Sequence, residues 1–240
     1  MQSIKIAVIG AGSRSFGPAV VRDVFLSEEL AKRGVELVLM DIRPEHLTDI
    51  ERYSRDVRDQ LGRAPASIWS TTDLERAVDG AAFVVTAIDA GRFFWWQQDF
   101  HIARKYGFRQ VFGENGGPGG LFHALRNMGP TVEIARAMER LCPDAPLLNF
   151  SNPEHKLCEA VSRLTKIAPV GLCHGVFMGV HQIAAMLGMP PERLDTAACG
   201  INHFTWFQTI RDRETGEDLY PKLRERSEER RVGKEWRSRW

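Results

Sequence analysis

Apolar and polar positions along the first forty residues follow two different periods. The run "IKIAVIG" (residues 4–10) is apolar and β-branched, as in a buried strand, "GPAVVRDVFLSEELAKRG" (17–34) has helical spacing, and "VELVLMD" (35–41) is a second strand that ends in an acid. This order predicts a βαβ unit, in which a helix joins two parallel strands.

The alternation continues to residue 194. Helical stretches at 43–62, 95–107, 119–141 and 152–164 are separated by strand-like runs, of which "AAFVVTAI" (81–88) is the longest. We therefore predict an α/β fold in residues 1–194, a Rossmann-like doubly wound parallel sheet. Residues 195–221 read as two β runs and a turn-rich segment, and predict the start of a second, α+β domain.

The charged stretch at residues 222–240 changes this picture. It holds eight Lys or Arg and four Glu without an apolar period, and the rest of the chain holds 24 basic and 27 acidic residues. We expect a disordered or non-native tail. The slightly acidic remainder argues against a nucleic-acid partner.

Further classes are excluded by the apolar runs and the cysteines. No run approaches the roughly 20 residues that span a bilayer, and the N-terminus resembles no signal peptide, so we expect no membrane partner and a cytoplasmic location. The four cysteines form no CxxC pair, which argues against a disulfide framework.

The segment "GAGSRSFG" (10–17) lies between the first strand and the first helix, where a dinucleotide fingerprint belongs. Gly10 permits a tight turn, Gly12 permits a pyrophosphate to approach the backbone, and the third glycine is displaced to Gly17. Asp41 can accept a hydrogen bond from an adenosine ribose and would repel a 2′-phosphate. We predict an NAD site formed by Gly10, Gly12, Ser13 and Asp41; a plain strand-to-helix turn is the alternative.

Other polar residues end strands at the carboxyl edge, where open α/β sheets bind ligands. Asn152 in "NFSNP" is a candidate substrate contact or a helix cap. Cys173 and His203 each end an apolar run, and together they suit a divalent metal ion; an inert buried cysteine is the alternative. The glycine-rich "ENGGPGG" (114–120) is either a flexible connection or a loop close to a ligand.

Two groups of residues are interpreted as structural. The aromatic cluster "FFWWQQD" (93–99) suits core packing. The histidines in helical patterns are interpreted as solvated or capping residues, namely His46, His101, His123, His155 and His181.

Five motifs, in this order, resemble those of a known family: "KIAVIGAGSRSFGPAVV", "NGGPGG", "NFSNP", "GLCHG" and "GINHF". They look like the NAD- and manganese-dependent glycosidases of glycoside hydrolase family 4, and the resemblance covers residues 4–210. The family is an exception to hydrolysis by two carboxylates. The resemblance implies that NAD takes a hydride from C3 of an α-linked sugar, that elimination and water addition follow, and that the hydride then returns.

The same resemblance implies roles for individual residues. Cys173 and His203 match the ligands of the Mn²⁺ or another divalent metal, and His174 matches the position of the catalytic acid. The "CHG" sequence is similar to members that act on unphosphorylated sugars, α-galacturonidases in particular, so galacturonides, glucosides and galactosides are the expected substrates. The full-length protein is expected to be a homo-oligomer.

One part of the family pattern is missing. The family's Tyr base lies downstream of His203, and none of Tyr53, Tyr106 and Tyr220 matches it. We therefore expect these 240 residues to be an incomplete and inactive fragment. Two other functions stay open: a 2-hydroxy acid dehydrogenase of the lactate/malate type, for which no Arg loop and His–Asp pair are found, and a non-catalytic NAD-binding protein.

Overall fold

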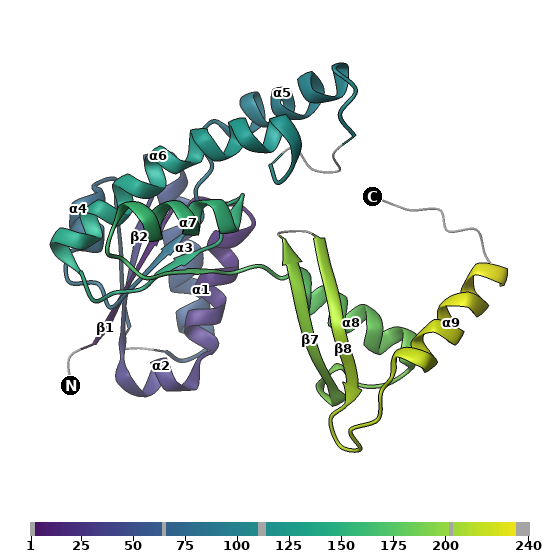
Figure 1. Cartoon of the computed structure of the whole chain (residues 1–240). Coiled ribbons are helices and arrows are strands. Elements are labelled where there is room, and N and C mark those ends of the chain that lie inside the picture. The colour runs from purple at the N-terminus through teal and green to yellow at the C-terminus, as the bar shows by residue number, and fades with distance from the viewer. Residues whose placement is uncertain (1–2, 64–65, 110–113, 202–203, 234–240) are drawn as a thin grey trace. The chain divides into compact units, whose positions relative to one another are not determined.

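The computed structural model describes residues 3–63, 66–109, 114–201 and 204–233 (Figure 1). The chain divides into two compact units, residues 1–172 and residues 173–240.

The first unit contains a six-stranded sheet whose strands are all parallel. Its order is β3-β2-β1-β4-β5-β6. Strands β2 and β3 extend the sheet on one side of β1, and β4, β5 and β6 extend it on the other side. This is the predicted Rossmann-like doubly wound arrangement. The strands are β1 (Ile4–Ile9), β2 (Val35–Met40), β3 (Ser67–Thr71), β4 (Phe83–Thr86), β5 (Leu147–Asn149) and β6 (Pro169–Gly171).

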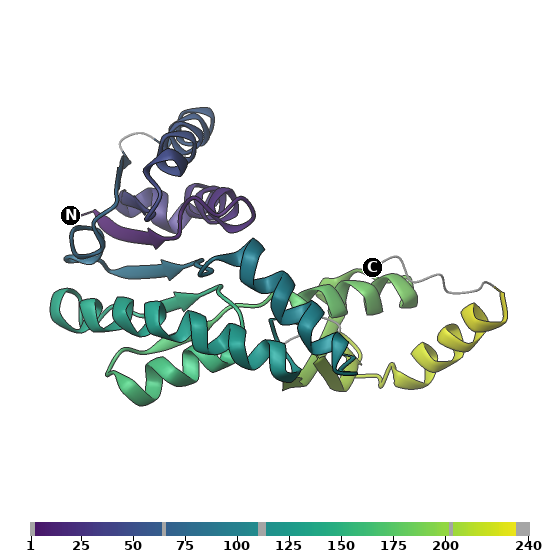
Figure 2. The same cartoon turned by 90° about the horizontal axis from the view of Figure 1, so that it is seen from above.

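Helices cover both faces of this sheet, with α1 and α3 on one side and α6 and α7 on the other (Figure 2). Neighbouring side chains of a strand therefore enter different cores: Val8 belongs to the core that contains Val21 of α1, and Ile9 to the core that contains Met138 of α6. This explains why β1 is apolar at consecutive positions. The helices are α1 (Phe16–Leu26), α2 (Glu28–Arg33), α3 (Pro44–Gln60), α4 (Leu74–Val78), α5 (Arg92–Lys105), α6 (Gly117–Leu141) and α7 (Glu154–Leu164).

Helix α5 corrects the interpretation of the aromatic cluster. Phe93 is 84% exposed, and Phe94 and Trp95 are also exposed, so these residues do not fill the core. Only two residues of α5, Asp99 and Ala103, are buried. The helix packs on α6 and not on the sheet, so its aromatic side chains lack a second layer to cover them within the described residues.

The second unit consists of α8 (Gly175–Leu187), the short 3₁₀ helix η1 (Pro191–Arg193), an antiparallel hairpin of β7 (Leu194–Ile201) and β8 (Phe204–Asp212), and α9 (Tyr220–Gly233). Its core includes Leu187 of α8, Leu194 of β7 and Ile210 of β8. Because α8 shares this core, the division falls after Leu172, whereas the sequence placed it after residue 194. Helical periodicity identifies α8 without indicating which core its apolar face joins.

Helix α9 enters the segment that we expected to be a tail. Leu223 packs on the core of the second unit, and Arg226 donates a hydrogen bond to the carbonyl of Met186 (3.0 Å). Residues 222–233 are therefore helical in this structure. Whether this sequence is native stays a prediction.

Candidate functional site

Two glycines of the motif stand where a side chain would meet backbone: Gly10 in the loop after β1 and Gly17 in the first turn of α1. Gly10 has a φ of +83°, and a Cβ there would lie 2.5 Å from the carbonyl oxygen of Ala87. A Cβ on Gly17 would lie 2.1 Å from the carbonyl oxygen of Ala11. The displaced third glycine of the motif thus permits α1 to pack closely on the loop, which is the role of the third glycine in a dinucleotide fingerprint.

Asp41 follows β2 at the same edge and is only 9% exposed. One carboxylate oxygen accepts a hydrogen bond from the backbone N–H of Gly12, and the other accepts one from that of Arg43, both at 3.0 Å. Gly12 must lack a side chain here, because its Cβ would lie 2.8 Å from Asp41 Oδ2. Each oxygen retains acceptor capacity for a ribose hydroxyl, so Gly10, Gly12 and Asp41 fit the adenosine half of a dinucleotide.

Ser13 lies in the same loop and begins the turn into α1. Its hydroxyl accepts a hydrogen bond from the backbone N–H of Phe16 (3.2 Å), and its carbonyl accepts one from Gly17 (2.9 Å). Its hydroxyl proton is still available to donate.

Side chains join the carboxyl ends of β4 and β5. The Thr86 hydroxyl donates to Asn149 Oδ1 (3.0 Å), and the backbone N–H of Ile88 donates to the Ser151 hydroxyl (2.8 Å). The loops after these two strands are therefore tied to each other, and the one after β4 touches Gly10 through Ala87.

Asn152 lies in this region but does not cap a helix. Pro153 is the residue that precedes α7, and no side chain caps that helix end. The capping interpretation of Asn152 is therefore wrong, and its contact with a substrate stays a prediction.

A network of charged side chains joins α5, α6 and the loop that follows β4. The sequence pattern does not identify this network. His123 of α6 is 1% exposed, and its ring nitrogens lie 3.9 Å from Asp89 Oδ1 and 3.5 Å from Asp99 Oδ2. Arg126 pairs with Asp99 and lies 3.2 Å from His123 Nδ1. The interpretation of His123 as solvated or capping is therefore wrong: α5, α6 and the β4–α5 loop enclose it.

Asp89 is the member of this network that lies on the loop after β4. Burial raises the pKa of its carboxyl, and the charges of His123 and Arg92 offset part of that effect. One signal pointed to this residue: like Asp41, it is an acid shortly after the end of a parallel strand.

Cys173 and His174 belong to the second unit, where His174 is the residue before α8. Cys173 Sγ accepts a hydrogen bond from the N–H of Gly175 (3.4 Å) at the start of α8. The other predicted metal ligand, His203, lies outside the described residues. Among the residues that are described, no three His, Cys, Asp or Glu side chains gather as a metal site.

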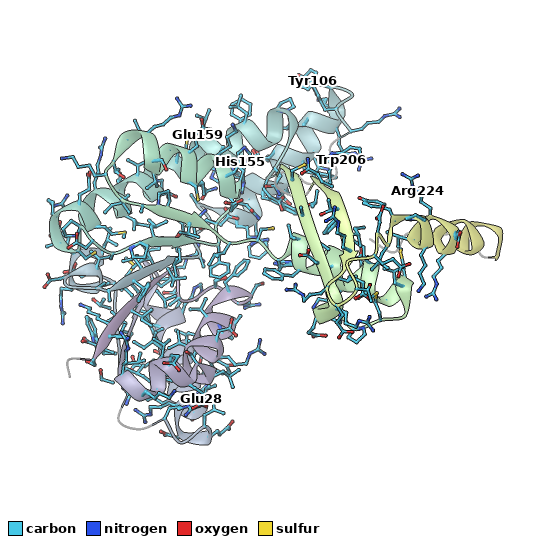
Figure 3. All side chains as sticks on the ribbon, turned by 60° about the horizontal axis from the view of Figure 1, so that its bottom comes forward. Glu28, Tyr106, His155, Glu159, Trp206 and Arg224 are labelled. Atoms are coloured by element: carbon cyan, nitrogen blue, oxygen red, sulfur yellow. The ribbon has the colours of Figure 1, made fainter. Side chains whose placement is uncertain are left out.

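The three tyrosines differ in their surroundings. Tyr53 packs against the core of the first unit, Tyr106 projects into solvent at the end of α5 with 74% of its surface exposed (Figure 3), and the Tyr220 hydroxyl donates to the carbonyl of Phe207.

Comparison with known proteins identifies the family. Residues 5–189 match the profile described as "Family 4 glycosyl hydrolase". The chain belongs to glycosyl hydrolase family 4. Residues 198–240 of this family 4 chain also match the profile of the family's C-terminal domain.

Curated relatives of this family 4 chain are glycosidases with different named sugars. It is 38% identical to an alpha-glucosidase of Erwinia rhapontici, covering 92% of this chain and 48% of that protein. It is 36% identical to an alpha-galactosidase of Bacillus subtilis (96% and 52%) and 35% identical to an alpha-galacturonidase of Thermoanaerobacter italicus (86% and 45%). The chain spans about half the length of these relatives.

Solved structures agree with the family 4 fold. A 6-phospho-alpha-glucosidase from gut microorganisms, solved with NAD and Mn²⁺, has a TM-score of 0.84 and 27% identity, covering 95% of this chain and 51% of that one. A lactate dehydrogenase of Eimeria maxima has a TM-score of 0.64 at 15% identity (93% and 61%), a likeness of fold alone. In the described part of the chain, every helix is too short or too polar to cross a membrane.

Proposed function

We propose that this family 4 chain binds NAD⁺ and, with Mn²⁺ or another divalent ion, forms part of a glycosidase for unphosphorylated α-glycosides. The observation that carries the proposal is the set of Gly10, Gly17 and Asp41 at the carboxyl ends of β1 and β2. The relative solved with NAD and Mn²⁺ supports both cofactors. The glucosidase, galactosidase and galacturonidase relatives support the substrate class.

The residues of the chain have separate tasks in this proposal. Asp41 holds the adenosine ribose through its hydroxyls and repels a 2′-phosphate. Gly10 and Gly12 have no side chain to keep a pyrophosphate away from the loop, and the Ser13 hydroxyl can donate to it. Asn152 contacts the sugar. NAD, when bound, supplies reversible uptake of a hydride from the sugar.

Two further residues act at the bond that is cleaved. His174 donates a proton to the leaving glycosidic oxygen, a transfer for which an imidazole is a common donor. Cys173 and His203 would hold the divalent ion, which when bound would stabilise negative charge on sugar oxygens.

Calorimetric titration of the 240-residue chain with NAD⁺ and NADP⁺ tests the cofactor site. We expect tighter binding of NAD⁺, and Asp41→Ala should weaken it by roughly 1–2 kcal/mol, the scale of a lost polar contact. Asp23→Ala, which removes an exposed acid of α1, is the matched control and should leave the affinity unchanged. Tighter binding of NADP⁺ than of NAD⁺ would contradict the assignment of Asp41.

The metal site and the reaction need a second experiment. p-Nitrophenol release from α-glucosides, α-galactosides and α-galacturonides should depend on both NAD⁺ and Mn²⁺ in a form of the protein as long as its relatives, and Cys173→Ser should abolish it. Activity that survives chelation and metal-free dialysis would exclude the metal, and net formation of NADH would indicate a dehydrogenase.

A further inference from the structure

Asp89 is an acid at the carboxyl edge of the sheet that has no role in the NAD site proposed above. It lies on the loop that follows β4, the neighbour of β1 at the point where the sheet changes direction. Gly10 touches this loop, because its Cβ would lie 2.5 Å from the Ala87 carbonyl oxygen and 3.0 Å from the Ile88 side chain. Ligands of doubly wound sheets lie across this point, with one mononucleotide half on the β1 side and the other on the β4 side.

The carboxylate of Asp89 makes long ionic contacts with Arg92 and His123 but accepts no hydrogen bond from either of them. Its Oδ1 atom is buried and accepts no hydrogen bond from the described residues. His123 Nε2 lies 3.9 Å from Oδ1, and Arg92 Nε lies 3.8 Å from Oδ2. Both distances exceed that of a hydrogen bond, so Oδ1 keeps unused acceptor capacity at the edge of the sheet.

The loop is anchored through its backbone as well as through this carboxylate, whose hydrogen bond with the Asn127 side chain lowers the pKa of Asp89 in part. Asn127 of α6 accepts a hydrogen bond from the backbone N–H of Ala90 at 2.8 Å, and that contact already ties the loop to the helix. Arg126, the nearby cation of α6, is paired with Asp99. Burial also raises the pKa of Asp89, so the charged form is held at a cost to stability. Such a residue in a ligand-binding region indicates a function.

We propose that Asp89 accepts a hydrogen bond from a hydroxyl of an uncharged sugar ring bound over β4, and that His123 is the positioning residue that holds its carboxylate. The inference rests on the proposed NAD site. Two sugar rings have this chemistry: the second ribose of the dinucleotide and the glycon of the substrate. A ring with a phosphate near Asp89 would be repelled.

Calorimetric titration of Asp89→Asn separates the two rings. If the ring is the ribose, NAD⁺ and ADP-ribose should bind about fivefold to tenfold more weakly than to the wild-type chain, and ADP, which lacks that ribose, should bind equally well. If it is the glycon, all three affinities should persist, and methyl α-glucoside or methyl α-galactoside should bind about fivefold more weakly to the NAD⁺-saturated chain. Asp144→Asn, an equal charge change on the exposed loop before β5, is the control and should change neither affinity.

Two results would overturn parts of the proposal in different ways. Unchanged binding of NAD⁺ and ADP-ribose, without a loss of sugar binding in Asp89→Asn, would exclude the role of Asp89 while the NAD site stands. Failure of the wild-type chain to bind NAD⁺ would overturn the proposed function, and this inference with it.

The role of His123 needs a readout that distinguishes positioning from folding. His123→Leu should weaken ligand binding as much as Asp89→Asn does, and His123→Gln, which retains an N–H donor, should restore at least half of that loss. Thermal unfolding of each variant shows whether the fold persists. Equal affinity in His123→Leu and the wild-type chain would exclude the positioning role.

Discussion

Asp41 and Asp89 lie at the same edge of one sheet, but different parts of the chain hold them. Backbone N–H groups of Gly12 and Arg43 satisfy both oxygens of Asp41. Asp89 faces His123 and Arg92 at distances that leave it without a direct bond to either. A carboxylate held by the backbone depends on loop geometry, which is local in sequence. A carboxylate held among side chains depends on how α5 and α6 pack.

The largest expected effect breaks the side-chain network. Arg126→Leu would leave the Asp99 side chain, which is 7% exposed, without its cation, and we expect a loss of about 3 kcal/mol in the free energy of unfolding. Arg140→Leu is the control on the same helix, because its pair with Glu75 is 58% and 64% exposed and should contribute less than about 1 kcal/mol. Urea unfolding followed by circular dichroism measures both. Equal losses would show that the Asp99 pair is no stronger than a surface pair.

The next largest loss of stability is expected in the glycine loop, next to the acid that is held by backbone N–H groups. Gly10→Ala would add a Cβ 2.5 Å from the Ala87 carbonyl oxygen at a φ of +83°. Gly80→Ala has similar left-handed strain (φ +62°) but no atom within 4 Å of its Cβ. We expect Gly10→Ala to be less stable than Gly80→Ala by roughly 1–3 kcal/mol, the cost of overpacking. Thermal unfolding of the two variants gives the difference, and equal midpoints would contradict the close approach.

A smaller effect should appear when Asp41 loses its charge. Asp41→Asn replaces one acceptor oxygen by an N–H₂ group, so one of the two backbone donors, at Gly12 or Arg43, loses its bond. We expect a loss of about 1–2 kcal/mol in the free energy of unfolding at pH 7. Exposed Asp23→Asn is the control. An Asp41→Asn variant as stable as the wild-type chain would mean that these two contacts are weak.

The sequence predicted what depends on local pattern. The βαβ unit, the glycine loop and the position of Asp41 all follow from strand and helix periods within the first 41 residues. Burial of His123 could not be predicted this way, because its neighbours Asp89 and Asp99 come from a loop and a helix that meet α6 only in the folded chain. Exposure of Phe93 and the association of α8 with the second core depend in the same way on which surfaces pack together.

The smallest expected effect, and the one that separates the two acids most sharply, is that Asp89→Asn should not destabilise the protein. Burial raises the pKa of Asp89, so the folded protein holds a proton there more tightly than the unfolded chain does. The stability of the wild-type chain therefore falls as the pH rises from the unfolded value of about 3.8 through the raised folded value. Asn has no proton to lose, so the variant should gain stability relative to the wild-type chain across that range.

At pH 7 we expect the free energy of unfolding of Asp89→Asn to equal that of the wild-type chain or to exceed it by less than about 1 kcal/mol. Chemical unfolding of both proteins between pH 4 and 8 measures the difference, and a destabilisation of Asp89→Asn that grows with pH would show that Asp89 is a structural anchor like Asp41.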